Sequence, residues 1–366
     1  MGENNSLYIS TLPLFPLFPL PKQTIPMKTI FITGASGCIG HYIVQTLLRE
    51  SDFHLYLLVR NPDKLQFSWQ NNSRITLLQG DLRNIDRFSD VLATVDAAVL
   101  VATVWGGLRD TYDINVVKTM RLLELLDPQV CQQVIYFSTA SVLDHHHQPL
   151  KAAGEYGTEY IRSKYTCLQH LSQLAIAPRI QVLFPTLVLG GDDNHPYSHL
   201  SRGFPEITRW ISLIRFFRAD SSFHFIHAQD IAMIVSYLLQ GNKPAATSSY
   251  MVLGSLPITL NQAVEETCRY FGKRIYFRIP LTTQLANFLI STLRWVGVKI
   301  ELSPWDRFCM YNRHFTYENP VHPATFGLPE TCSTFADVLQ LSTAKPNASL
   351  DGDAQTTQKQ GKETPR

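Results

Sequence analysis

Short, unbroken apolar runs alternate with longer amphipathic segments through the first half of the chain. The strand-like runs cover residues 29–33, 55–59, 75–78, 97–102, 133–138 and 179–184, and the helical patterns between them cover 38–50, 85–93, 111–126 and 155–175. The strand-like runs are apolar throughout, which is typical of parallel strands buried on both faces. Repeated strand–helix units of this kind predict an α/β fold with a doubly wound parallel sheet.

The pattern becomes irregular after residue 184. Strands are expected at 223–226 and 250–253, with a helix at 231–239 that Asp230 would cap, and further helices at 260–271, 282–296 and 304–312. We therefore expect a sheet domain over 27–185, rejoined by 223–255. A smaller, mostly helical substrate lobe is expected from 186–222 and 256–341.

The two ends of the chain differ from the rest. Residues 1–26 carry a proline every two or three positions within an apolar stretch, which excludes a helical span or signal segment. We interpret 1–26 as a disordered arm or as sequence ahead of a true start at Met27. Residues 342–366 have almost nothing to bury and are expected to be disordered.

Composition narrows the classes of function. The 366 residues carry 32 Lys and Arg against 30 Asp and Glu, a net charge of +2, which argues against a nucleic-acid-binding protein. The six cysteines form no CxxC pair, so neither a disulfide framework nor a zinc site is expected. No apolar run reaches the roughly 18 residues of a membrane helix. A cytoplasmic protein is the expectation.

A glycine-rich turn follows the first strand. Gly34, Gly37 and Gly40 stand three residues apart, the first two between that strand and the helix at 38–50 and the third in the first turn of this helix. Such glycines permit a tight turn, a close approach of backbone amides to a pyrophosphate, and close packing of the helix on the sheet. The helix N-terminus would then face the phosphates with free N–H groups. The turn predicts a dinucleotide cofactor.

The residue after the second strand indicates which dinucleotide. An acidic residue at this position commonly binds the adenosine ribose hydroxyls, whereas this chain has Arg60. A guanidinium suits a 2′-phosphate and offers a hydroxyl no acceptor, so NADP(H) is favoured over NAD(H). Asp81, after the third strand, is placed to meet the adenine amino group.

Proton-transfer candidates lie on one predicted helix and on the strand before it. Tyr160 and Lys164 are four residues apart and so share a helix face, where an ammonium would lower the tyrosine pKa. An ordinary amphipathic pair has the same spacing. Ser138, Thr139 and Ser141 end the fifth strand, where open α/β sheets bind ligands, although turn hydroxyls are the alternative for two of them.

In this order, the turn, the hydroxyl-bearing strand end and the Tyr/Lys pair resemble the extended short-chain dehydrogenase/reductase superfamily over about residues 27–255. The resemblance implies a Rossmann-type sheet with Thr139, Tyr160 and Lys164 as catalytic residues. It also implies a set of cofactor contacts: Gly34, Ser36, Gly37, Cys38, Ile39, Gly40, Arg60, Asp81, Leu82, Ala102, Thr103, Tyr160, Lys164, Phe184 and Pro185.

Departures from the superfamily's patterns narrow the substrate. Ala140 and Ser141 stand where dehydratases of this branch carry Asp-Glu, which argues against dehydration. Phe184 and Leu187 stand where many sugar-nucleotide enzymes carry Arg and Asn, so a less polar substrate is expected. The main hypothesis is an NADP(H)-dependent oxidoreductase acting on one carbonyl or alcohol. A nucleotide-sugar epimerase with retained cofactor and a non-catalytic cofactor-binding regulator or assembly protein remain alternatives.

Four further features have open interpretations. Three consecutive histidines, 145–147, favour a solvated loop over a metal site. Trp105 suits either stacking on a ligand or packing, and Asn115 either anchors the cleft or lies on the surface. The amphipathic helix at 282–299 favours a lid or dimer contact over a membrane surface. A small-molecule substrate and a monomer or homodimer are expected.

Overall fold

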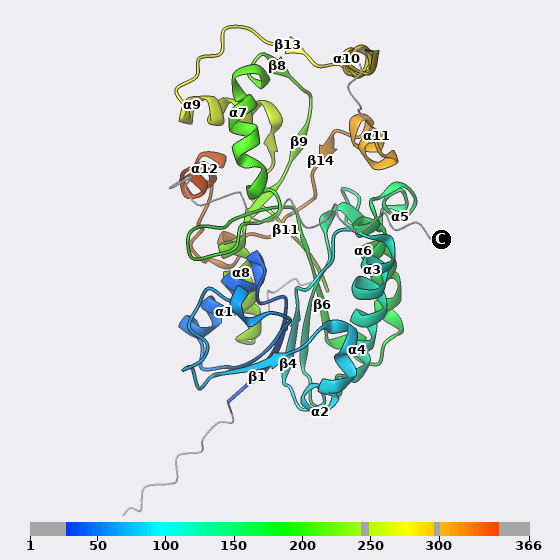
Figure 1. Cartoon of the computed structure of the whole chain (residues 1–366), viewed down its shortest axis with the longest axis vertical. Coiled ribbons are helices and arrows are strands. Elements are labelled where there is room, and N and C mark those ends of the chain that lie inside the picture. The colour runs from blue at the N-terminus through cyan, green and yellow to red at the C-terminus, as the bar shows by residue number, and fades with distance from the viewer. Residues whose placement is uncertain (1–26, 243–248, 296–300, 344–366) are drawn as a thin grey trace, which may run out of the picture.

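The computed structural model describes residues 27–242, 249–295 and 301–343, which form a central seven-stranded sheet with helices on both faces (Figure 1). All its strand pairings are parallel, and the strand order is β11-β6-β5-β4-β1-β2-β3. The strands are β1 (Thr29–Thr33), β2 (His54–Val59), β3 (Ile75–Gln79), β4 (Ala97–Leu100), β5 (Gln133–Phe137), β6 (Ile180–Pro185) and β11 (Tyr250–Leu253). This is the predicted Rossmann-type α/β fold.

Alternate residues of each strand serve two separate cores. Ile30 and Ile32 of β1 pack with α1 (Cys38–Glu50) and α8 (Ala228–Leu239) on one face of the sheet. Phe31 packs on the opposite face with α4 (Thr119–Leu125) and α6 (Glu159–His170). Both faces are therefore apolar, which explains why the strands have no alternating pattern in the sequence.

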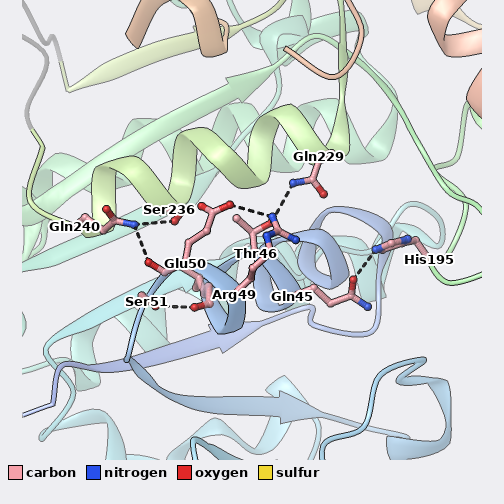
Figure 2. Close-up of polar contacts among 10 residues, drawn as sticks. Gln45, Thr46, Arg49, Glu50, Ser51, His195, Gln229, Ser236 and Gln240 are labelled. Atoms are coloured by element: carbon pink, nitrogen blue, oxygen red, sulfur yellow. Dashed lines mark hydrogen bonds and ion pairs between the residues drawn. The ribbon is translucent and has the colours of Figure 1, made fainter. Parts of the chain in front are cut away.

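Polar contacts also join α1 to α8, as Figure 2 shows. Gln229 donates from its side-chain amide to the Thr46 hydroxyl over 3.1 Å, and Gln240 donates to the Glu50 carbonyl over 3.5 Å. These bonds lie at either end of the apolar seam between the helices. They supplement the apolar packing of α1 against α8.

The predicted helix at 155–175 is wrong in its continuity, because it is two helices in the structure. α5 (Lys151–Tyr156) ends at Gly157, and α6 begins after Thr158, whose hydroxyl accepts a bond from the Ile161 N–H. A β-carbon at Gly157 would lie 2.2 Å from the Ala153 carbonyl oxygen, so the chain turns where only glycine fits. Tyr160 consequently lies in the first turn of α6.

Two other predicted helices are also divided. Residues 85–93 form the 3-10 segment η2 (Leu82–Phe88) followed by α2 (Ser89–Leu92). Residues 111–126 form α3 (Leu108–Tyr112), the π-helical segment η3 (Asp113–Lys118) and α4. Hydrophobic spacing alone cannot separate these helix types, because each places an apolar stripe on the sheet.

The predicted cap of α8 is also wrong. α8 begins three residues earlier than expected, at Ala228, and His227 caps it by accepting a bond from the Gln229 N–H. Asp230 is buried in the first turn, and its carboxylate accepts a 2.7 Å bond from the Thr331 N–H. Asp230 thus fastens a distant segment of the chain to α8.

The C-terminal part is mainly helical and gathers at the upper end of the molecule in Figure 1. Its helices are α7 (Phe204–Ile214), α9 (Leu260–Tyr270), α10 (Thr283–Trp295), α11 (Pro304–Tyr311) and α12 (Phe335–Thr343). The strand predicted at 223–226 is two short strands, β9 (Ser222–Phe223) and β10 (Phe225–His227). The sequence analysis missed the other short strands of this part: β7 (Leu187–Leu189), β8 (Phe217–Arg218), β12 (Ile258–Thr259), β13 (Ile279–Pro280) and β14 (His314–Phe315).

Some predictions concern residues outside the described ranges. The arm at 1–26, nearly all of the tail at 342–366 and the end of the helix at 282–299 lie there. Among the helices of the described ranges, none combines the length and the apolar character needed to cross a membrane.

Candidate active site

The glycine-rich turn lies at the point where the strand order of the sheet reverses. β1 has β2 on one side and β4 on the other, and ligands of open α/β sheets bind at such a switch point beyond the carboxyl ends of the strands. Gly34 adopts a φ of 77°, and a β-carbon there would lie 2.8 Å from the Ala102 backbone nitrogen. The turn after β1 and the segment after β4 therefore approach each other at backbone distance.

The turn also leaves the N-terminus of α1 open. Gly37 stands at the N-cap, is exposed, and supplies no side-chain cap. The first N–H groups of a helix have no partner within the helix, so those of Cys38, Ile39 and Gly40 face outward with the positive end of the helix dipole. This arrangement fits the pyrophosphate of a dinucleotide. Ser36, also predicted as a cofactor contact, is part of the same turn.

Arg60 and Asp81 lie at neighbouring strand ends, after β2 and β3. The guanidinium of Arg60 is 74% exposed and lies 3.9 Å from the Asp81 carboxylate. Asp81 caps η2, and Arg83 lies closer to its carboxylate, at 3.2 Å. The Asp81 carboxylate therefore pairs mainly with Arg83, and N–H groups of the Arg60 guanidinium remain available to bind an anion. Leu82 is buried behind this edge, so its side chain packs in the core.

Asn115 ties the segment after β4 to α6. The side chain is fully buried, accepts bonds from the Thr103 hydroxyl and the Val104 N–H, and donates to the Val104 carbonyl. It also donates to the Ser163 hydroxyl over 2.9 Å, and Ser163 in turn donates to the Tyr160 carbonyl. Asn115 is therefore an anchor beside the cleft rather than a surface residue. The sequence analysis did not identify Ser163.

Thr139 and Tyr160 meet at the carboxyl end of β5. Thr139 follows the strand and is partly buried, the Tyr160 ring is 8% exposed, and the Thr139 hydroxyl lies near enough to the phenol to lower its pKa slightly. Ser141 lies beside them, with its hydroxyl 3.4 Å from that of Thr139. The structure thus places Thr139 and Tyr160, two of the three predicted catalytic residues, together at this strand end.

Lys164 lies one helical turn after Tyr160 and is 2% exposed. Its ammonium donates a 2.7 Å bond to the Phe137 carbonyl at the end of β5 and lies over the Tyr136 ring. Burial lowers the pKa of Lys164 to about 8. The lysine therefore keeps a predominantly positive charge at neutral pH, one turn away from the phenol.

The predicted lowering of the tyrosine pKa does not occur in this structure. Burial raises the pKa of Tyr160 well above its ordinary value, and the hydrogen bond from Thr139 offsets only part of that rise. The Lys164 ammonium donates instead to the Phe137 carbonyl. At neutral pH, Tyr160 is consequently a neutral phenol and a proton donor.

Three aromatic rings, those of Tyr160, Trp105 and His199, are stacked in a row at this site. Trp105, in the loop after β4, stacks on Tyr160 with ring centroids 3.9 Å apart. His199, in the segment after β7, stacks on Trp105 at 5.2 Å. The sequence singled out Trp105 but not His199, because nothing in a local pattern signals a contact between segments almost a hundred residues apart.

Phe184 and Pro185, at the end of β6, are both buried. Phe184 packs edge-on against Tyr250, so it can meet a cofactor only through its backbone. Leu187, just beyond, is 41% exposed. Leu187 is therefore the side chain that offers apolar surface at this strand end.

Within the described ranges, no group of three or more His, Cys, Asp or Glu side chains is arranged to hold a metal ion. Two of the histidines of 145–147 bond instead to a segment that precedes α12. His145 bonds to the Thr316 carbonyl, and His146 bonds to the Glu318 carboxylate. These contacts place the histidine loop against residues 316–318.

Several solved structures share this fold. A dTDP-glucose 4,6-dehydratase from Bacillus anthracis, in complex with NAD, aligns with a TM-score of 0.59 at 16% identity, covering 86% of this chain and 96% of that one. A UDP-glucuronic acid 4-epimerase from Bacillus cereus, with NAD, aligns with a TM-score of 0.58 at 17% identity, covering 86% and 97%. A UDP-glucose 4-epimerase from Thermotoga maritima gives 0.54 at 12% identity, again covering 86% and 97%.

Comparison of sequences gives the family. None of the curated protein sequences matches this chain. The sequence model of the NAD dependent epimerase/dehydratase family, however, matches residues 30–254, which include the glycine-rich turn, Thr139, Tyr160 and Lys164. The match covers more than half of the chain and all seven strands of the sheet. The protein therefore belongs to the NAD dependent epimerase/dehydratase family, within the extended short-chain dehydrogenase/reductase superfamily.

Proposed function

We propose that the protein is an NADP(H)-dependent oxidoreductase that interconverts a carbonyl and an alcohol on a relatively apolar substrate. The observation that carries the proposal is that the Tyr160 phenol and the Thr139 hydroxyl lie together at the carboxyl end of β5, one helical turn from the buried Lys164 ammonium. Two adjacent hydroxyls can both bond to one substrate oxygen, which is the requirement for a proton transfer at that oxygen.

The chain's own residues would divide the work as follows. Thr139 donates to the substrate oxygen and fixes its position. Tyr160, neutral because burial raises its pKa, gives its proton to that oxygen during reduction and recovers it during oxidation. Lys164, whose pKa of about 8 keeps it mostly protonated at neutral pH, stabilises the phenolate that remains. The nicotinamide, when bound, supplies or accepts the hydride.

The cofactor site is assigned from the turn and from Arg60. The open N-terminus of α1 would take the pyrophosphate, and the exposed Arg60 guanidinium would take a 2′-phosphate, which favours NADP(H). Several structural neighbours hold NAD, so this preference is the point at which the chain would depart from them.

The substrate end is assigned from apolar surface. Phe184 and Pro185 are buried and Leu187 is exposed at the carboxyl end of β6. A hydroxyl-rich sugar diphosphate needs hydrogen-bond donors, because its polar groups lose water on binding. The exposed Leu187 side chain supplies none, which favours a substrate with few polar groups.

A nucleotide-sugar epimerase that retains its cofactor is the second candidate, favoured by the family match and by the epimerases among the structural neighbours. In that reaction the hydride returns to the same substrate, so Tyr160 would first take a proton and then give one back. The two candidates differ in whether the cofactor is consumed.

The experiment measures NADPH oxidation by the purified chain with a panel of ketones and aldehydes, alongside interconversion of UDP-sugars. We expect net NADPH oxidation with apolar carbonyl compounds and a loss of at least about 100-fold in kcat for Tyr160→Phe, with unchanged NADPH affinity. UDP-sugar interconversion without net NADPH oxidation would instead establish the epimerase. Full activity of Tyr160→Phe would overturn both.

A further inference from the structure

Trp105 shields the proposed acid/base from the outside of the molecule. Its indole lies 18° from parallel with the Tyr160 ring, at a centroid distance of 3.9 Å. The Tyr160 ring is 8% exposed, whereas Trp105 remains 54% exposed. One face of the indole is thus occupied by the buried phenol, and the other faces outward.

His199 lies on that outer face. Its imidazole is within 12° of parallel with the indole, at 5.2 Å. His199 is itself exposed, so displacing its ring from the indole breaks less buried contact than displacing the buried Tyr160 ring would. The outer face of Trp105 is therefore the one that a ligand can take over, by replacing an exposed imidazole.

Backbone contacts on the N-terminal side of Trp105 fix the position of its indole ring. Val104, immediately before Trp105, is held by two bonds to the buried Asn115. Gly107 follows two residues later, with a φ of 84°, and leads directly into α3. The start of the Trp105 loop thus has a fixed position relative to α6, which carries Tyr160.

We propose that the outer face of Trp105 binds a flat, weakly polar ring of the substrate and so determines its specificity. This rests on the proposed function, because the ring is placed relative to a carbonyl bonded to Tyr160 and Thr139. The indole separates its outer face from the phenol, so the ring belongs to the substrate beyond the reacting carbonyl. The substrate class is an aryl-alkyl ketone or aldehyde in which a short chain joins the ring to the carbonyl.

The apolar surface nearby and the chemistry of stacking agree with this assignment. Leu187, with 41% of its surface exposed, offers apolar contact at the neighbouring strand end. Aromatic rings prefer offset-stacked or edge-to-face contacts with other aromatic rings, worth about 2- to 12-fold in affinity beyond the burial of area. A planar ring should therefore bind more tightly than a saturated ring of the same carbon count.

The test compares benzylacetone with its cyclohexyl counterpart, which has the same carbonyl and chain but a puckered ring. Binding of each is measured by titration calorimetry on the full chain with NADP present, because the oxidised cofactor has no hydride to give and the ketone therefore stays unreacted. We expect benzylacetone to bind about 2- to 12-fold more tightly than the cyclohexyl compound. We expect Trp105→Leu to abolish that difference.

Trp210→Leu is the matched control, because Trp210 is 52% exposed on α7 and lies outside the stack. This control should leave the preference intact, and thermal melting should show that both variants fold. His199→Ala should keep or strengthen benzylacetone binding, since it removes the competing imidazole.

Three results would overturn the assignment. These are an equal preference in wild type and Trp105→Leu, a fall in benzylacetone affinity with His199→Ala, and tighter binding of UDP-glucose that is insensitive to Trp105→Leu. Failure of the proposed function looks different. In that case no carbonyl compound is reduced at all, while the binding preference and its dependence on Trp105 persist.

Discussion

Replacing Asn115 with alanine should loosen the segment after β4 from α6. The Asn115 side chain is fully buried and makes four hydrogen bonds, to the Thr103 hydroxyl, the Val104 N–H, the Val104 carbonyl and the Ser163 hydroxyl. Alanine removes all four and leaves these buried groups to find other partners.

The magnitude follows from those bonds. A typical intramolecular hydrogen bond contributes about 1 kcal/mol net, and a buried group left unpaired costs about 1–3 kcal/mol. Four bonds, partly replaced by water entering the space, give a loss of about 3 kcal/mol in the free energy of unfolding. For a domain of this size, that loss lowers Tm by about 6–12 °C.

The assay is thermal unfolding, with Gln132→Ala as the matched control. Gln132 also donates from its amide to two backbone carbonyls, those of Gln129 and Val130, but both bonds are exposed. The control should therefore change the free energy of unfolding by less than about 0.5 kcal/mol. If Asn115→Ala melts within 2 °C of that control, on the order of 1 kcal/mol or less, the assignment of Asn115 as an anchor is refuted.

Three further predictions concern the turn, the cap of α8 and the cofactor. Gly40→Ala places a β-carbon 2.1 Å from the Gly34 carbonyl oxygen and should lower the free energy of unfolding, measured with a denaturant, by about 3 kcal/mol. In Gly37→Ala the β-carbon lies 3.4 Å from the same atom, so this variant should keep its stability while binding NADP more weakly in calorimetry. Equal stability of the two variants would contradict this. Burial lowers the pKa of His227 to about 4, below the value of about 6.5 in an unfolded chain, so the unfolded state binds more protons between these values and stability falls as pH drops from 6.5 to 4. His227→Asn keeps a capping acceptor without titrating and should flatten that slope in urea titrations at several pH values; an unchanged slope would assign the acid sensitivity elsewhere. Arg60→Ala should weaken NADP binding by about 10-fold and NAD binding by less than about 2-fold, and an equal effect on both would remove the basis for NADP preference.

The sheet and its turn were predictable because local physics dictates them. A strand that is apolar on both faces is buried on both faces only between two layers of helices. Regularly spaced glycines between such a strand and a helix allow the backbone few conformations other than a tight phosphate-binding turn. The first strand, the turn and α1 therefore lie where the sequence placed them, with α1 spanning the expected residues.

The local course of α6 was less predictable. Tyr160 and Lys164 share a helix, as expected, but the helix starts only after Thr158 because of the close approach at Gly157. That approach depends on where the Ala153 carbonyl points in three dimensions. A single glycine in an amphipathic pattern gives no sign of it.

The electrostatics of the site depend on burial, which spacing does not reveal. Four-residue spacing suggested that Lys164 would lower the pKa of Tyr160, yet burial raises the tyrosine pKa and lowers the lysine pKa. Both shifts come mainly from desolvation by surrounding segments. The same holds for His199, whose contact with Trp105 exists only once the segment after β7 packs against the loop after β4.

Hydride transfer from free NADPH to the substrate through a site that contains Tyr160 is the central claim, and isotope labelling tests it most directly. NADPH in which deuterium replaces both hydrogens at the reactive nicotinamide carbon is incubated with the full chain and benzylacetone, and the product is analysed by mass spectrometry. We predict an alcohol that contains one deuterium per molecule, and none of this product with Tyr160→Phe. Unlabelled product, or labelled product formed equally well by Tyr160→Phe, would contradict the account.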